Sequence, residues 1–208
     1  MSDRVLLIAT RSEDKMREIV PLLAHLPARL LSLRDAGIPA TVAEDSIERF
    51  ETFEENAAAK ARYFFIASGG TPTVADDSGL VVRALGGAPG VRSKRWSNRP
   101  ELDGIALDEA NNGHLLGALA GVADRRASYV CVAAYADSSS ALAARGETSG
   151  TITATARGSA GFGYDPYFLS DDLACTFGEA DPADKNRVSH RGRAFRKLAT
   201  ELGAVLGH

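Results

Sequence analysis

One apolar run near the start of the chain constrains the fold most. Residues 5–9, Val-Leu-Leu-Ile-Ala, are all apolar and are bounded by polar residues, which is typical of a strand buried on both faces. A turn over residues 10–12 follows. Then comes a helical pattern opened by Glu13 and Asp14, two acids that suit the positive end of a helix dipole. The run therefore predicts a fully buried strand that leads directly into a helix.

Strand and helix patterns alternate along the rest of the chain. We expect further strands over residues 28–33, 73–75, 127–136 and 150–156, and helices over 52–68, 103–119 and from Ser189 onward. The inward face of the last helix is predicted to comprise Phe195, Leu198, Leu202 and Val205. Such alternation over 208 residues predicts a single α/β (α+β) domain, residues 1–208, with one mixed sheet flanked by helices.

Charge and composition exclude several classes of protein. The formal net charge of −3 does not provide the general basic field typical of nucleic-acid-binding proteins. Cys131 and Cys175 lie far apart, outside any CxxC pair, and are expected to be reduced thiols. The N-terminal segment lacks a signal-peptide pattern, and no stretch approaches the ~20 apolar residues of a membrane span. We therefore expect a cytoplasmic protein that binds neither nucleic acid nor membranes.

The sequence Asp76-Asp77-Ser78-Gly79 is the sharpest local signal for chemistry. It follows the short strand predicted over residues 73–75 and is expected to lie in a loop. Adjacent carboxylates at a strand end can hold Mg²⁺, which takes oxygen ligands and shares them with substrate phosphates. The alternative is an ordinary polar turn, because Asp, Ser and Gly are also the residues expected there.

Two segments could bind phosphate. Backbone N–H groups after Thr10-Arg11-Ser12 at a helix start, with Lys15 one turn further on, are typical of an anion site, although no P-loop pattern is present. Lys60 lies four residues after Asn56, so both share one face of the second helix. Either lysine could instead be an ordinary exposed helix residue.

The segment Gly161-Phe162-Gly163-Tyr164-Asp165-Pro166 lies in a Gly-rich loop predicted over residues 158–166. An exposed aromatic side chain on such a loop can stack on a base, or it can anchor the loop in the core. Lys185, His190 and Arg191 add potential hydrogen-bond donors near the start of the last helix, where His190 could equally be a structural capping residue.

Five segments, in this order along nearly the whole chain, resemble the inosine/xanthosine triphosphate pyrophosphatase family. They are LLIATRSEDKMREI, TFEENAAAKA, VADDSGLVVRALGGAPGVRSKRW, GFGYDPYF and TFGEADPADKNRVSHRGRA. The resemblance implies hydrolysis of purine nucleoside triphosphates such as ITP, dITP and XTP to the monophosphate and pyrophosphate, with Mg²⁺ as cofactor. It also implies a mixed twisted sheet divided into two lobes, with the active site in the cleft between them, and a homodimer.

The resemblance also assigns roles to individual residues. The catalytic base falls on Asp77, and the metal ligands on Glu48, Asp77 and the adjacent Asp76. The phosphate contacts fall on Thr10, Arg11, Ser12, Lys15, Lys60 and Ser78. The base contacts fall on Phe162, Gly163, Tyr164, Asp165, Lys185, His190 and Arg191. Two positions depart from the family pattern, because Ser12 replaces an Asn and Ala160 replaces a Gly.

Two alternatives remain open. The first is a related pyrophosphatase of the Maf type, against which the GFGYDP and SHR segments argue. The second is a catalytically silent nucleotide-binding sensor, against which the intact DDSG segment argues.

Overall fold

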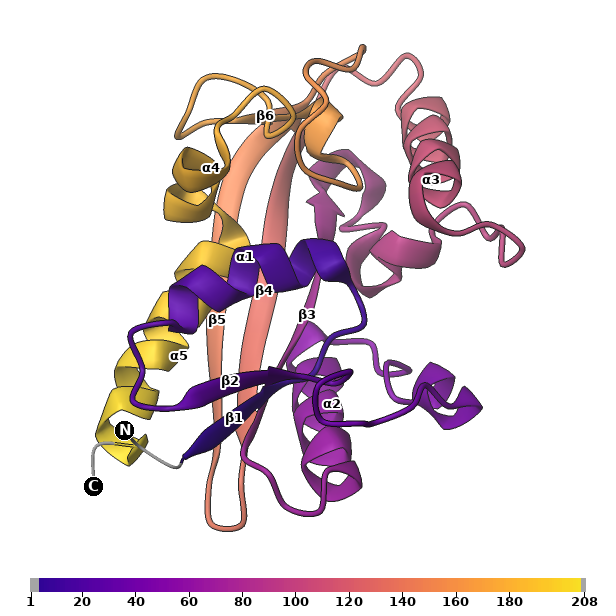
Figure 1. Cartoon of the computed structure of the whole chain (residues 1–208). Coiled ribbons are helices and arrows are strands. Elements are labelled where there is room, and N and C mark those ends of the chain that lie inside the picture. Colours follow the sequence, from indigo (N-terminus) through magenta and orange to yellow (C-terminus); the bar gives the residue numbers. More distant parts are fainter. Residues whose placement is uncertain (1–3, 207–208) are drawn as a thin grey trace. The chain divides into compact units, whose positions relative to one another are not determined.

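The computed structural model describes residues 4–206 and has a mixed six-stranded sheet with helices (Figure 1). The strands are β1 (Val5–Ile8), β2 (Arg29–Ser32), β3 (Thr73–Val82), β4 (Arg126–Ala136), β5 (Ala141–Ile152) and β6 (Phe168–Ser170). The helices are α1 (Glu13–Leu23), α2 (Phe53–Ala67), α3 (Gly104–Ala118), α4 (Pro182–Val188) and α5 (His190–Leu206). The sheet order is β2-β1-β3-β4-β5-β6, with β1 parallel to both neighbours and β5 antiparallel to β6. The predicted α/β class is confirmed.

The chain divides into two compact units. The first comprises residues up to Asp77, Cys131–Gly146 and the chain from Arg191 on, and the second comprises Ser78–Val130 and Glu147–His190. Because the segments of the two units interleave along the chain, neither unit is a separate stretch of sequence. The prediction of a single domain over residues 1–208 stays a prediction.

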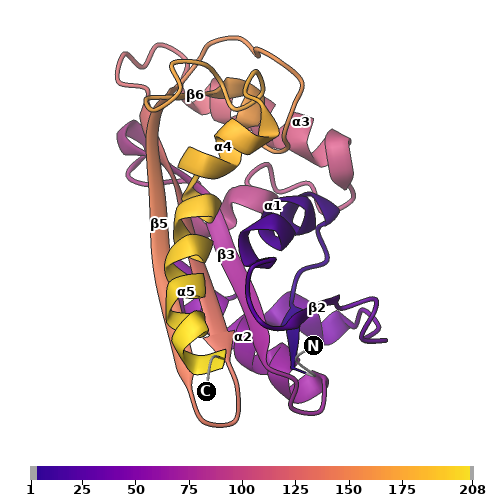
Figure 2. The same ribbon diagram turned by 60° about the vertical axis from the view of Figure 1, so that its left-hand side comes forward.

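The core of the first unit forms between β1, α1, β4 and α5. Leu6 and Ile8 of β1 pack with Phe195 and Leu198 of α5, as part of one buried apolar cluster. Figure 2 shows α5 extending beside the strands. The inward face predicted for α5 is confirmed at Phe195, Leu198 and Leu202 but is wrong at Val205, which is 39% exposed. Leu202 is the last α5 residue in the cluster, so the final turn of the helix extends past it.

The core of the second unit is rich in aromatic side chains. Tyr129 packs against Phe168 and Phe177 with ring centroids 4.7 and 6.0 Å apart. Leu115 and Leu119, at α3 and its C-cap, are buried in the same cluster. This burial fixes α3 on the second unit by removing apolar surface from water.

Helices α2 and α3 confirm two sequence predictions closely. Thr52 caps α2 by accepting a hydrogen bond from the Glu55 backbone N–H, and Glu55 in turn accepts one from the Thr52 hydroxyl. The helix ends at Ala67 with Ser68 as its C-cap. Asp103 is the N-cap residue of α3. Within the described residues, no helix has both the length and the apolar character that a membrane crossing requires.

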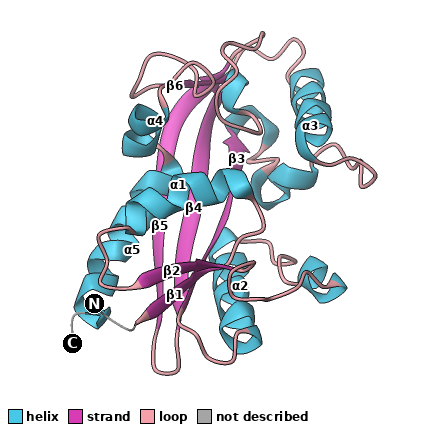
Figure 3. Ribbon diagram, in the orientation of Figure 1, coloured by secondary structure: helices cyan, strands magenta, loops and turns pink. Residues whose placement is uncertain are grey.

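Strand β3 corrects the prediction of a short strand followed by a loop. It continues without interruption from Thr73 to Val82, so Asp76-Asp77-Ser78-Gly79 lies inside the strand (Figure 3). The sequence predicted a loop here, since Asp, Ser and Gly are residues expected in turns. Here both aspartates are buried and contact cationic or amide groups, so the strand can continue to the apolar residues at 80–82.

Strand β5 begins nine residues earlier than predicted, at Ala141 instead of Gly150, and ends at Ile152. Its buried residues alternate, but several of them are small, so the apolar signal in the sequence is weak. Gly150 is required by packing, because an added Cβ would lie 2.4 Å from the carbonyl oxygen of Leu169 in β6.

Candidate active site

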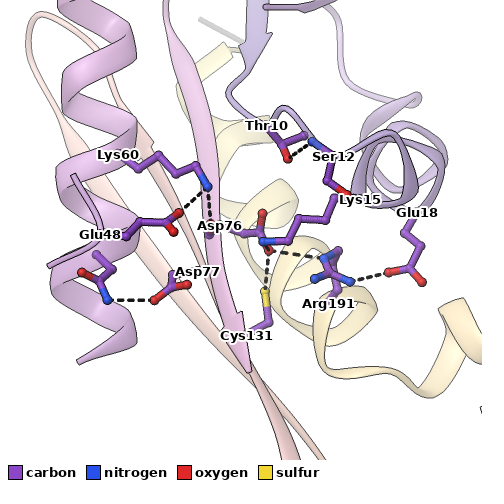
Figure 4. Close-up of polar contacts among 11 residues, drawn as sticks. Thr10, Ser12, Lys15, Glu18, Glu48, Lys60, Asp76, Asp77, Cys131 and Arg191 are labelled. Atoms are coloured by element: carbon purple, nitrogen blue, oxygen red, sulfur yellow. Dashed lines mark hydrogen bonds and ion pairs between the residues drawn. The ribbon is translucent and has the colours of Figure 1, made fainter. Parts of the chain in front are cut away.

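Asp76 is the most deeply buried charge of the candidate site, with an exposed fraction of 0%. Its Oδ2 lies 3.1 Å from Lys15 Nζ and 3.3 Å from Arg191 Nε, and the Cys131 thiol donates to the same oxygen over 3.9 Å (Figure 4). Burial raises the pKa of Asp76, but the charges of Lys15 and Arg191 outweigh it and hold this pKa well below its usual value. Asp76 is therefore a carboxylate neutralised by two cations.

Arg191, at the start of α5, connects Asp76 to α1. Its side chain is 2% exposed, and its second contact is an ion pair with Glu18. Burial lowers the pKa of Arg191, but the charges of Glu18 and Asp76 outweigh it and raise this pKa above its usual value. The structure thus places Arg191 in the first unit, between two carboxylates. The base contact predicted for it stays a prediction.

Asp77 has a different environment, because successive side chains of a strand point to opposite faces of the sheet. Its Oδ2 accepts a hydrogen bond of 2.9 Å from the side-chain amide of Asn56. The same amide accepts a hydrogen bond from the Phe50 backbone N–H and donates one to the Phe50 carbonyl oxygen. Burial and the nearby charge of Glu48 raise the pKa of Asp77 to about 6, although Lys15 and Asn56 oppose the rise. Asp77 can therefore exchange a proton near neutral pH.

Glu48 and Lys60 form an ion pair beside the two aspartates. Lys60 Nζ donates to Glu48 Oε1 over 2.6 Å and to the backbone oxygen of Asp76 over 3.3 Å (Figure 4). Burial raises the pKa of Glu48, but the charges of Lys60 and Lys15 outweigh burial and hold this pKa below its usual value. Conversely, burial lowers the pKa of Lys60, but Glu48 and Asp76 raise it. Both groups are thus charged at neutral pH.

The turn before α1 contains Thr10 and Ser12, whose predicted phosphate contacts stay a prediction. Ser12 is the N-cap residue, and its hydroxyl accepts from the Lys15 backbone N–H over 3.2 Å. The Ser12 N–H in turn donates to the Thr10 hydroxyl over 3.2 Å. Ser12 therefore uses its hydroxyl to cap the helix, a role that Asn could also fill.

Arg11 contacts the segment that precedes Glu48 in the chain. Its guanidinium donates to both carboxylate oxygens of Glu44, at 2.8 and 3.1 Å, and to the carbonyl oxygens of Ile38 and Pro39. The hydrogen bond to Glu44 raises the pKa of Arg11. Arg11 is thus placed to hold this segment, and its predicted phosphate contact stays a prediction.

The second unit contains the Gly-rich loop with Phe162. Asp165 Oδ2 accepts from the Phe162 backbone N–H over 2.8 Å and from Lys185 Nζ over 2.6 Å. Lys185 Nζ also lies 5.1 Å from the centroid of the Phe162 ring. The pair of Asp165 and Lys185 is almost fully buried. The structure therefore brings Phe162, Asp165 and Lys185 together, and the base contacts predicted for them stay a prediction.

Three other predicted residues lie in the second unit. Tyr164 is buried, and its hydroxyl donates to the carbonyl oxygen of Ser93 over 2.8 Å. His190 is also buried and stacks on Tyr129, with ring centroids 4.5 Å apart and planes at 8°. Ser78 is half-buried within β3. Tyr164 thus anchors its loop, as the alternative interpretation of this segment allowed.

Three residues of the first unit that contact the candidate site were not assigned a site role from the sequence. Asn56 was recognised only as sharing a helix face with Lys60, and it binds Asp77. Glu18 lies three residues after Lys15 on α1, a spacing that places both on one face. Cys131 gave no signal, because its role arises only where β4 lies beside β3.

The sequence of this chain matches a known protein family. The sequence model of the Ham1 family matches residues 6–201. The chain belongs to this family. A relative from Syntrophobacter fumaroxidans, named dITP/XTP pyrophosphatase, is 45% identical over 207 residues, which cover 99% of this chain and 85% of the relative. Another of that name, from Frankia alni, is 43% identical over 96% of this chain and 98% of its own length.

Solved structures of similar proteins share the fold. A HAM1 protein from Coxiella burnetii is 34% identical with a TM-score of 0.82, covering 97% of this chain and 99% of its own. A nucleoside-triphosphatase/dITP/XTP pyrophosphatase from Mycobacterium abscessus is 36% identical with a TM-score of 0.71, covering 95% and 98%. The resemblance inferred from the five sequence segments is confirmed.

Proposed function

We propose that this protein hydrolyses noncanonical purine nucleoside triphosphates, ITP, dITP and XTP, to the monophosphate and pyrophosphate. The observation that supports this best is the pair of adjacent aspartates on β3. Asp76 is neutralised by two cations, whereas Asp77 lies beside Glu48 with its pKa raised to about 6. The names of the relatives from Syntrophobacter fumaroxidans and Frankia alni support this substrate class.

Asp77 is the proposed general base. A catalytic base works best when its pKa lies near the operating pH, and burial beside Glu48 brings the pKa of Asp77 to about 6. The Asn56 amide holds one of its oxygens at 2.9 Å and so fixes the orientation of the carboxylate. Asp77 would accept the proton of the attacking water.

The donor groups at this site fit Mg²⁺. Glu48 and Asp77 offer the carboxylate oxygens that this cation prefers, and the charge of Glu48 raises the pKa of Asp77, so the two charges repel each other. Among the side chains that the structure describes, which do not include that of Asp45, no group of three or more His, Cys, Asp or Glu is arranged for a metal, so we propose that phosphate oxygens or water supply the other ligands. We assign Glu48 and Asp77 to this role, since Asp76 is fully buried and pairs with two cations, whereas Glu48 pairs with Lys60 and remains partly exposed. When bound, Mg²⁺ supplies positive charge to the triphosphate oxygens.

The lysines of the first unit suit a polyphosphate. Lys15 and Lys60 lie on opposite sides of Asp76, one at its carboxylate and one at its backbone oxygen (Figure 4). They would neutralise charge on the departing pyrophosphate, while the N–H groups at the start of α1 near Thr10 and Ser12, with Ser78, would bind further phosphate oxygens.

The residues of the second unit suit the base. Phe162 offers an aromatic face, and Lys185 and His190 offer hydrogen-bond donors. These base contacts, and the homodimer that the family resemblance implies, are part of the proposal.

Incubation of the purified protein with ITP tests the proposal. In the presence of Mg²⁺ we expect IMP and pyrophosphate in equal amounts, and after chelation of the metal we expect neither. A protein that bound ITP without releasing pyrophosphate would instead be a nucleotide sensor. Release of a diphosphate and orthophosphate would contradict the proposed site of attack.

Removing either lysine should weaken triphosphate binding far more than monophosphate binding. For Lys15→Ala and Lys60→Ala we expect a loss of roughly 10- to 100-fold in kcat/KM for ITP, because a hydrogen bond to a charged group contributes ~1.5–3 kcal/mol. IMP should bind almost as tightly as to the wild type. Arg17→Ala is the control, because Arg17 also lies on α1 but is 70% exposed. Equal losses for ITP and IMP would place the lysines elsewhere.

A further inference from the structure

Helix α3 holds both backbone polar groups of Gly163, the residue directly after Phe162. Asp108 Oδ2 accepts a hydrogen bond from the Gly163 N–H over 2.8 Å. Asn112 Nδ2 donates one to the Gly163 carbonyl oxygen over 3.0 Å. Asp108 and Asn112 are four residues apart, so they project from the same face of α3. The helix therefore holds the loop at Gly163 through two hydrogen bonds, one accepted by Asp108 and one donated by Asn112.

The loop itself has a backbone shape that favours glycine on either side of Phe162. Gly161 and Gly163 have φ angles of +74° and +64°, in the left-handed region. A Cβ at Gly161 would also lie 2.1 Å from Asp165 Oδ2, whereas one at Gly163 would meet no atom within 4 Å. Asp165 and its contacts thus determine the local shape of the loop, and α3 determines where the Phe162 end of it lies.

Helix α3 is itself packed into the core of the second unit. Leu115 and Leu119 are fully buried in the core of the second unit. Asn111 is buried as well, where its amide donates to the Lys94 carbonyl and accepts from the Ser97 N–H. Two bonds from a packed helix restrain a glycine that has no side chain to anchor it.

We propose that Asp108 and Asn112 are positioning residues that fix Phe162 as the platform for the purine base. This inference rests on the proposed function, in which Phe162 stacks on the base. Neither residue contacts the substrate. They act through Gly163, so their loss should weaken recognition of the base and leave recognition of phosphate intact.

Inhibition of ITP turnover by the two products separates these effects, because IMP has a base and pyrophosphate has none. For Asp108→Ala we expect the inhibition constant of IMP to rise about ten-fold, the effect of losing one hydrogen bond that involves a charged group. For Asn112→Ala, which loses a hydrogen bond between neutral groups, we expect a smaller rise of roughly two- to ten-fold. The inhibition constant of pyrophosphate should not change. Asp108→Asn retains an oxygen acceptor for the Gly163 N–H and should restore IMP binding.

Glu109→Ala is the matched control, since it removes the same charge from the adjacent, exposed position of α3 and should leave both constants unchanged. Thermal unfolding of each variant checks its fold, and Asn112→Ala provides the test if Asp108→Ala does not fold. Unchanged IMP inhibition, or equal losses for IMP and pyrophosphate, would overturn the inference. A wild-type protein without ITP turnover would instead reject the proposed function, and this inference with it.

Discussion

Asp77→Asn should reduce kcat by ~10²–10⁴-fold, the usual contribution of general acid–base catalysis, and should at the same time stabilise the metal-free protein. The amide cannot accept a proton from water, and it removes one of the two negative charges proposed to hold Mg²⁺. Its oxygen can still accept the hydrogen bond from Asn56, so the local geometry is retained.

The gain in stability follows from the raised pKa of Asp77. Burial and Glu48 raise this pKa from 3.8 to about 6, so the folded state binds a proton more tightly than the unfolded state. Stability is therefore lost as the pH rises from about 4 to about 6, and at neutral pH the full loss is roughly 2–3 kcal/mol. Asn has no such charge, so the metal-free variant should melt at a higher temperature than the wild type at pH 7.

Asp76→Asn is the matched control, because the same substitution one residue earlier should have the opposite effect on stability. Asp76 neutralises Lys15 and Arg191 inside the protein, and breaking a buried ion pair by removing one partner costs ~3–5 kcal/mol. The pH dependence also has the opposite sign. The lowered pKa of Asp76 means that its contribution is present at neutral pH and is lost as the pH falls through the acidic range.

Thermal unfolding without metal, together with steady-state kinetics, distinguishes the two aspartates. If Asp77→Asn retained more than roughly a tenth of the wild-type kcat, far more than loss of a general base allows, another group would be the base. If both variants were destabilised equally, the different environments assigned to the two carboxylates would be wrong.

The sequence predicted best where a local pattern determines the structure. The extents of α2 and α3 and the buried strand at 5–8 follow from short-range rules that do not depend on the rest of the fold. The candidate site residues followed from the family resemblance. They could not be placed by periodicity alone, because an exposed and a buried lysine have the same spacing on a helix.

The sequence failed where tertiary contacts override local preference. Two aspartates inside a strand contradict ordinary strand composition, and contacts from Lys15, Arg191 and Asn56, all distant in sequence, help to make them tolerable in β3. The predicted start of β5 was nine residues too late, because small residues form the buried face of this strand. The ion pair between Arg191 and Glu18 joins residues 173 positions apart, so no local pattern could reveal it.

ITP should be hydrolysed far faster than ATP, because the base contacts proposed for the second unit are donors. Hypoxanthine and xanthine present a 6-keto acceptor, whereas adenine presents a 6-amino donor. The Lys185 ammonium can only donate, and it lies beside the Phe162 ring in a buried environment. A polar site left unpaired by the wrong substrate can discriminate by ~10⁴–10⁵.

GTP is a weaker case, since it shares the 6-keto group and differs from ITP only by a 2-amino group. Discrimination against GTP must come from a missing acceptor or from limited space beside C2. We therefore expect it to be smaller than discrimination against ATP. The 2′-hydroxyl should matter little, so dITP and ITP should be hydrolysed at similar rates.

The ratio of kcat/KM for ITP to that for ATP, measured on the purified protein at one fixed Mg²⁺ concentration, tests the central proposal most directly. We predict a ratio approaching ~10⁴, the range reached when a buried polar site rejects a mismatched group, with XTP and dITP close to ITP. Equal values of kcat/KM for ITP and ATP would contradict the assignment of this protein to noncanonical purine nucleotides.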